Sequence, residues 1–166
     1  MLYFAYGSNL NVAAMKRRCP KAKKVGRLIL PNAKLVFRGV ADVVWAPKSR
    51  CPGGLWEITR KCEAALDRYE GVASGLYRKE YLTVRLAKGG EPQQVLVYLM
   101  NSDGVMPPWE EYIDTIAQGY RDFGLDRYLC YLDQALEHSW AEKNKTRHLH
   151  RRWVQKGRPP LAQLEG

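Results

Sequence analysis

Hydrophobic and polar positions along the chain form short runs with the spacing of strands, interrupted by a few stretches with the spacing of helices. Strands are predicted over residues 2–6, 24–30, 33–38, 40–46, 55–58, 77–87 and 93–100. We expect a tight turn at Pro31-Asn32, and the Pro- and Gly-rich residues 47–54 are typical of a loop. The clearest pairing is a hairpin, in which Lys88-Gly89-Gly90-Glu91 joins the last two strands.

Four stretches carry the start and stop signals of helices. Asn9 or Asn11 precedes a helix over residues 11–18, which Pro20 closes, and Thr59 precedes a helix that runs to Glu70 and stops at Gly71. Two more helices are expected, one from near residue 109 to 124 and one from 126 to about 143. These elements predict an α+β domain over residues 1–143, rather than an alternating doubly wound sheet, followed by a basic tail over residues 144–166.

The first ten residues contain the pattern with the most chemical content. An aromatic strand runs directly into Gly7-Ser8-Asn9, a group of turn residues, and a helix follows. Backbone N–H groups at the start of a helix have no partner within it and lie at the positive end of its dipole. Such a loop suits an anion or a developing oxyanion, although strand–turn–helix units also occur in many domains without a site.

The composition of the chain is ordinary for a globular protein. Its 166 residues, with 46% hydrophobic and 27% charged residues, are enough for one globular domain without disulfides or metals. Four cysteines lie far apart without a C-x-x-C pair, which argues against a metal site, and we expect no cofactor. Neither a secretory signal nor a membrane-spanning apolar run is recognisable, so a cytoplasmic location without membrane attachment is expected.

The net charge of +10 is concentrated towards the end of the chain. From residue 141 onward there are seven Lys and Arg and two Glu, so seven minus two, or +5, lies in this last stretch. A basic segment can bind nucleic acid, anionic lipid or an acidic protein, or can simply be solvated. No nucleic-acid motif is present, and Trp140 and Trp153 are not interleaved with the basic residues in a stacking pattern, which argues against nucleic acid.

Two motifs, roughly sixty residues apart, resemble those of a known family. Tyr6-Gly7-Ser8-Asn9 after an N-terminal strand resembles the signature of the gamma-glutamyl cyclotransferase family, and residues 67–77 resemble its catalytic segment, with Glu70 in the position of the acid/base glutamate. Gly54-Leu55-Trp56 is also similar to a Gly-x-x-Trp segment of that family. The resemblance covers about residues 2–125, and residues 31–54 match it only loosely.

The resemblance implies a fold, a reaction and a set of site residues. It implies a small mixed β-barrel with surrounding helices, in which the loop and Glu70 meet at one mouth. Members of the family cyclise a gamma-glutamyl group to 5-oxoproline and release the attached amine, a reaction that calls for no metal or organic cofactor. By resemblance, Tyr77 walls the pocket and Tyr112 covers the substrate, although a tyrosine on a helix is as commonly a core residue. The residues implied to hold the glutamyl head are Tyr3, Phe4, Ala5, Tyr6, Gly7, Ser8 and Asn9.

The reaction requires a group that takes a proton from the attacking amine and later returns one to the leaving nitrogen, and Glu70 suits both roles. Its place at the negative end of a helix, one turn after Asp67, predicts a raised pKa. The sequence does not decide which group leaves: it could be an amino acid, cysteinylglycine, a simple amine or a chain tethered to an acidic carrier protein. The alternative from another class is a non-catalytic binding module of the same fold.

Overall fold

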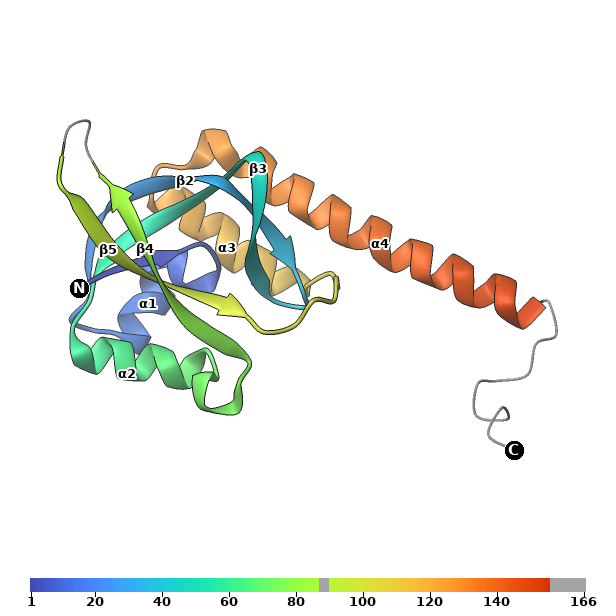
Figure 1. Cartoon of the computed structure of the whole chain (residues 1–166), viewed down its shortest axis with the longest axis horizontal. Helices are drawn as coiled ribbons and strands as arrows, with labels where there is room; N and C mark the ends of the chain where they lie inside the picture. Colours follow the sequence, from blue (N-terminus) through green and yellow to red (C-terminus); the bar gives the residue numbers. More distant parts are fainter. Residues whose placement is uncertain (87–89, 156–166) are drawn as a thin grey trace.

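The computed structural model describes residues 1–86 and 90–155, which form a mixed β-sheet with helices packed around it (Figure 1). The strands of this part are β1 (Leu2–Ala5), β2 (Lys23–Phe37), β3 (Ala41–Glu57), β4 (Tyr77–Arg85) and β5 (Pro92–Met100). The α-helices are α1 (Val12–Arg18), α2 (Arg60–Tyr69), α3 (Glu110–Asp122) and α4 (Leu129–Gln155). Short 3-10 turns lie at η1 (Ser8–Leu10), η2 (Val72–Ser74) and η3 (Asp126–Tyr128).

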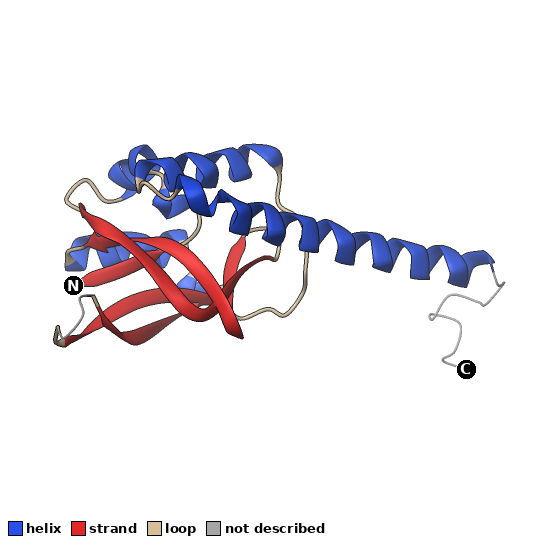
Figure 2. Ribbon diagram, turned by 90° about the horizontal axis from the view of Figure 1, so that it is seen from above, coloured by secondary structure: helices blue, strands red, loops and turns tan. Residues whose placement is uncertain are grey.

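The short strand β1 is the centre of the sheet, whose order is β2-β3-β1-β5-β4. It pairs antiparallel with β3 and parallel with β5, while β2–β3 and β4–β5 are antiparallel pairs. Figure 2 shows these strands curving strongly as a layer, with α4 running out beyond them. The α+β prediction is confirmed, but the sheet is open and not a closed barrel, because β2 and β4 are its two edges in the described residues.

Two predicted chain breaks in the first half are wrong. The turn expected at Pro31-Asn32 is a bulge inside the continuous strand β2, with a register shift there and Asn32 at a φ of 53°. The loop expected over residues 47–54 belongs to β3, where Gly53 pairs with Leu28. Glycine is needed here for packing, since a Cβ at position 53 would lie 2.4 Å from the ring of Phe4.

The helix termini follow the local signals in the sequence. The side chain of Asn11 accepts a hydrogen bond from the Ala14 N–H at 2.9 Å, and Thr59 accepts one from the Cys62 N–H at 3.2 Å, so both caps are confirmed. Gly71 ends α2 in the left-handed conformation, at a φ of 63°. The chain therefore leaves α2 immediately after Glu70, and the cap fixes where that carboxylate lies.

The last helix is longer than predicted. It was expected to end near residue 143, but α4 continues to Gln155, so the first part of the basic segment is helical. Residues 156–166 and 87–89 lie outside the described residues, and the latter include the first two residues of the predicted turn at 88–91. None of the helices in the described part combines the length and the apolar composition needed to cross a bilayer.

Candidate active site

A cavity of about 230 Å³ lies at the carboxyl end of β1, where the chain turns into η1. Segments far apart in the sequence meet there: the end of β1, the start of β3, the end of α2, the start of β4, the strand β5 and the start of α3. Its lining residues are Tyr3, Tyr6, Gly7, Ser8, Asn9, Val40, Ala41, Tyr69, Glu70, Leu76, Tyr77, Tyr98, Trp109 and Tyr112.

Most of the residues predicted for the site are in this cavity. Eight of them line it: Tyr3, Tyr6, Gly7, Ser8, Asn9, Glu70, Tyr77 and Tyr112. Phe4 and Ala5 do not, since both are fully buried in the core. Side chains alternate between the faces of a strand, so Phe4 points away from the face of Tyr3 and packs beside Gly53. The signature segment therefore contributes to the core as well as to the cavity.

Glu70 is connected to the signature loop through Asn9. The Asn9 side-chain amide donates to Glu70 Oε1 at 2.8 Å and to the Tyr3 hydroxyl at 3.0 Å. Its carbonyl oxygen accepts from the Arg18 guanidinium at 2.8 Å. Asn9 is buried and thus holds the carboxylate, a phenol and a cation in one fixed arrangement.

The environment of Glu70 tunes its acidity. Burial raises the pKa of Glu70 from 4.5 to about 7, against the opposing effects of the Arg18 charge and the Asn9 hydrogen bond. The upward direction agrees with the prediction, but its cause is burial and not Asp67. The carboxylate of Asp67 instead contacts Lys79 Nζ at 3.0 Å and accepts from the Tyr98 hydroxyl at 2.7 Å. At neutral pH the Glu70 carboxyl group can therefore both accept and give up a proton.

The loop between β1 and α1 brings backbone N–H groups to the wall of the cavity. In η1 the Leu10 N–H donates to the Gly7 carbonyl at 3.0 Å and the Asn11 N–H to the Ser8 carbonyl at 3.2 Å. The N–H groups that begin this turn have no partner within it. Burial raises the pKa of the Tyr112 phenol, against the opposing effect of its hydrogen bond from the Ala41 N–H. Gly7 and Ser8, the residues at which this turn begins, both line the cavity.

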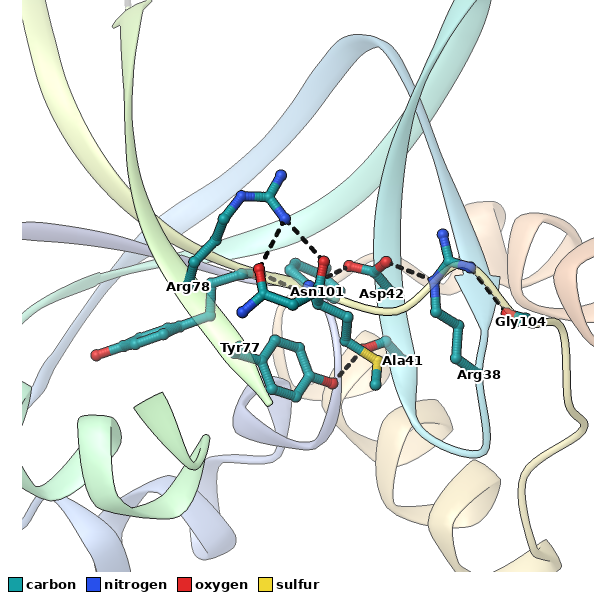
Figure 3. Close-up of polar contacts among 10 residues, drawn as sticks. Arg38, Ala41, Asp42, Tyr77, Arg78, Asn101 and Gly104 are labelled. Carbon is teal, nitrogen blue, oxygen red and sulfur yellow. Dashed lines mark hydrogen bonds and ion pairs between the residues drawn. The ribbon is translucent and has the colours of Figure 1, made fainter. Parts of the chain in front are cut away.

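On the side of the cavity formed by the start of β3, Tyr77 and Tyr112 both hydrogen-bond to the backbone of Ala41. The Tyr77 hydroxyl donates to the Ala41 carbonyl at 2.6 Å (Figure 3), and the Tyr112 hydroxyl accepts from the Ala41 N–H at 3.1 Å. A Cβ at Gly7 would lie 3.2 Å from the Tyr112 oxygen and 3.1 Å from the Ala41 Cβ. Glycine at position 7 thus lets the loop approach this wall closely. Burial raises the pKa of Tyr77 far above its ordinary value, so its phenol stays protonated.

An ion pair with little solvent exposure anchors the start of β3, where Ala41 lies. Arg38 and Asp42 lie 2.8 Å apart with side-chain exposures of 10% and 3%, and Asp42 also accepts from the Met100 N–H at 3.0 Å. Arg38 donates further to the Gly104 carbonyl at 2.8 Å (Figure 3). These contacts tie the start of β3 to the end of β5 and to the loop that follows, and so fix the position of Ala41.

Several residues of the site carried no recognisable signal in the sequence. Arg18 is one of three basic residues at the end of α1, yet it lies 3.6 Å from the centre of the Tyr69 ring. The Tyr69 hydroxyl is hydrogen-bonded to Ser8 Oγ at 3.1 Å. Tyr98 reaches the cavity from β5, where its strand pattern showed only an apolar position. Only the packing of α1, α2 and β5 around the loop gives these side chains a shared role.

The site combines a carboxyl group poised for proton transfer with backbone N–H donors and protonated phenols, the equipment of an acyl-transfer enzyme. In the described part of the chain, no three His, Cys, Asp or Glu side chains are grouped to hold a metal ion. Among the described residues that line the cavity, Glu70 is the one that carries a carboxyl group.

Comparisons with known proteins agree with this class of site. The sequence profile of the family described as "Gamma-glutamyl cyclotransferase, AIG2-like" matches residues 3–120. Proteins named gamma-glutamylcyclotransferase from Bos taurus and Homo sapiens are each 31% identical over 136 residues, which is 75% of this chain and 72% of theirs. A solved structure named gamma-glutamyl cyclotransferase has a TM-score of 0.71 at 28% identity, over 81% of this chain and 85% of its own. The chain belongs to the gamma-glutamyl cyclotransferase, AIG2-like family.

Proposed function

We propose that the protein is a gamma-glutamyl cyclotransferase that converts the gamma-glutamyl group of a small-molecule amide to 5-oxoproline and releases the amine. The observation that carries the proposal is the juxtaposition of Glu70, whose pKa is about 7, with the loop of residues 6–9 in one cavity. The names of the relatives support the same activity. Glu70 is proposed as the catalytic acid and base.

The reaction moves two protons between two nitrogen atoms. The α-ammonium group of the substrate first gives a proton to Glu70, and the free amine then attacks the γ-carbonyl carbon. The new carbon–nitrogen bond closes a five-membered ring, and the carbon–nitrogen bond of the original amide breaks. A second proton leaves the attacking nitrogen, and both protons arrive on the expelled amine. Glu70 carries these protons in turn, which a carboxyl group with a pKa near neutrality does efficiently.

The loop is proposed to stabilise the charge that develops on the γ-carbonyl oxygen. As that carbon becomes tetrahedral, its oxygen acquires negative charge, and fixed N–H donors then stabilise it more strongly than they do the neutral carbonyl. The N–H groups of Gly7 and Ser8 begin the η1 turn at the cavity wall. Removing one such donor from an oxyanion hole costs roughly 10²–10³ in kcat. Tyr3, Asn9 and Tyr77 are proposed to hold the glutamyl head.

The comparisons favour catalysis over a non-catalytic module, because the matching relatives are named as enzymes and the acid/base residue is present at the cavity. They offer no support for an acidic carrier protein as partner, and a nucleic-acid partner has only the net charge behind it. The proposal therefore stays with a small-molecule gamma-glutamyl substrate. A cytoplasmic location remains a prediction.

Release of 5-oxoproline by wild-type protein and by Glu70→Gln tests the proposal. Glutamine keeps the shape of the side chain and an oxygen for Asn9, but it cannot exchange a proton, so we expect a loss of at least about a hundredfold in kcat/KM. Glu63→Gln is the matched control, since Glu63 lies on the same helix but pairs with Lys79 outside the cavity. Near wild-type turnover by folded Glu70→Gln would refute the assignment of Glu70.

A further inference from the structure

The mouth of the active-site cavity continues into a second groove of about 490 Å³, called here the apolar groove. Val40, Leu76 and Trp109 line both spaces, so the apolar groove begins where the cavity ends. Its complete lining is Arg38, Gly39, Val40, Leu76, Met100, Met106, Pro107, Pro108, Trp109, Trp140 and Lys143. A molecule that emerges from the cavity on this side must lie along these residues.

Large apolar side chains are unusually exposed along the apolar groove. Met106 and Trp109 are each 55% exposed, Leu76 is 46% exposed and Trp140 is 44% exposed. Single apolar residues at a protein surface are ordinary, but a contiguous group marks a binding surface. The Trp109 ring also packs on Tyr112, with ring centres 4.8 Å apart, so this surface is continuous with a residue of the active-site wall.

The backbone holds the apolar groove in place. The Gly39 N–H donates to the Met106 carbonyl at 2.8 Å, and the Met106 N–H donates to the Phe37 carbonyl at 3.0 Å. Gly39 has a φ of 85°, and a Cβ there would lie 2.5 Å from the end of the Met106 side chain. The next two residues are Pro107 and Pro108, whose rings fix their own φ angles. The exposed apolar surface is thus part of a fixed wall that needs little reorganisation to bind a ligand.

The charges around the apolar groove suit an uncharged or anionic occupant. Arg38 is already paired with Asp42, and Lys143 Nζ lies 4.7 Å from the centre of the Trp140 ring. The described lining contains no carboxylate that would attract a cation. An apolar side chain contacting Trp109 and Trp140, with a carboxylate near Lys143, would match this distribution.

We propose that the apolar groove binds the leaving half of the substrate and selects gamma-glutamyl amides of bulky apolar amines, such as aromatic amino acids. This inference rests on the proposed cyclotransferase function, which places the glutamyl head beside Glu70 and requires the expelled nitrogen to leave through the mouth. The cavity of about 230 Å³ is below the roughly 300–1,000 Å³ of sites that enclose a drug-sized ligand. It therefore holds the glutamyl head, and the amine half extends into the apolar groove.

The test compares two substrates that differ only by a phenyl ring, gamma-glutamyl-phenylalanine and gamma-glutamyl-alanine, by their release of 5-oxoproline. For wild-type protein we expect kcat/KM to be roughly tenfold higher for the phenylalanine compound, the scale on which an apolar pocket discriminates. Trp140→Ser and Met106→Ser should each reduce this ratio towards one, with turnover of the alanine compound within about twofold of wild type. Trp45→Ser is the matched control, since Trp45 is 53% exposed on β3 and lines neither space.

Each result separates the two proposals. Equal efficiency on both compounds in wild-type protein, or a ratio that survives in both Trp140→Ser and Met106→Ser, would overturn the assignment of the apolar groove while leaving the cyclotransferase activity intact. Loss of the ratio in Trp45→Ser would show that the effect is not local and would also overturn it. Absence of 5-oxoproline from either compound and from a wider panel of gamma-glutamyl amides would overturn both proposals.

Discussion

Replacing Glu70 with glutamine should stabilise the protein at neutral and alkaline pH while it lowers activity at least about a hundredfold. Burial raises the pKa of Glu70 from 4.5 to about 7. Between these values the unfolded chain has released the proton and the folded chain still holds it. The folded state thus binds more protons, and the stability that Glu70 confers falls as the pH rises. Below pH 4.5 Glu70 is protonated in both states, so its ionisation does not change the stability. Above pH 7 it is ionised in both states, and the loss of stability is complete.

The size of this loss of stability follows from the shift in the pKa of Glu70. A difference of about 2.5 pH units at 1.36 kcal/mol per unit gives about 3 kcal/mol of destabilisation by the buried charge above pH 7. Glutamine removes the charge, and its side-chain oxygen still accepts the hydrogen bond from Asn9. Glu70→Gln should therefore match wild type in its free energy of unfolding near pH 4 and exceed it by up to about 3 kcal/mol near pH 8.

Urea denaturation of both proteins at pH 4 and pH 8 measures this difference, because other titrating groups cancel between wild type and variant. Glu80→Gln serves as the control, since Glu80 forms an exposed pair with Arg78 whose loss should cost about 0–1 kcal/mol. A difference between wild type and Glu70→Gln that is the same at both pH values would show that the carboxylate carries no burial penalty. Glu70 would then lack the near-neutral pKa on which its proposed acid/base role depends.

Two further perturbations test the surroundings of the site. Arg18→Met removes the charge that lowers the pKa of Glu70, so the acidic limb of the pH profile of kcat/KM should move to higher pH, whereas Arg17→Met on the exposed side of α1 should leave it in place. An unmoved limb would contradict the electrostatic role of Arg18. Asp42→Ala leaves the buried Arg38 unpaired and should lower the free energy of unfolding by about 3–5 kcal/mol in urea, and a loss below about 1 kcal/mol would show that the pair is dispensable.

Local signals explain how much of the architecture could be predicted. A helix cap depends on one side chain and the backbone within three residues of it, so Asn11 and Thr59 were recognisable from the sequence. Gly71 likewise ends α2 through its own backbone conformation, which places Glu70 at the end of a helix. The strand, loop and glutamate motifs were readable for the same reason, because each is a short stretch with its own chemistry.

Contacts between distant segments decided the rest. Gly53 looks like a turn residue in the sequence, yet it lies in β3. Glycine is required there because the ring of Phe4, 49 positions earlier, leaves no room for a Cβ. Arg18 joins the site only because the fold brings α1 beside α2. The sequence determined that Glu70 ends a helix, but its raised pKa comes from burial, which requires the loop, β4, β5 and α3 to come together around the cavity. Desolvation depends on everything that surrounds a group, and only the tertiary structure sets those surroundings.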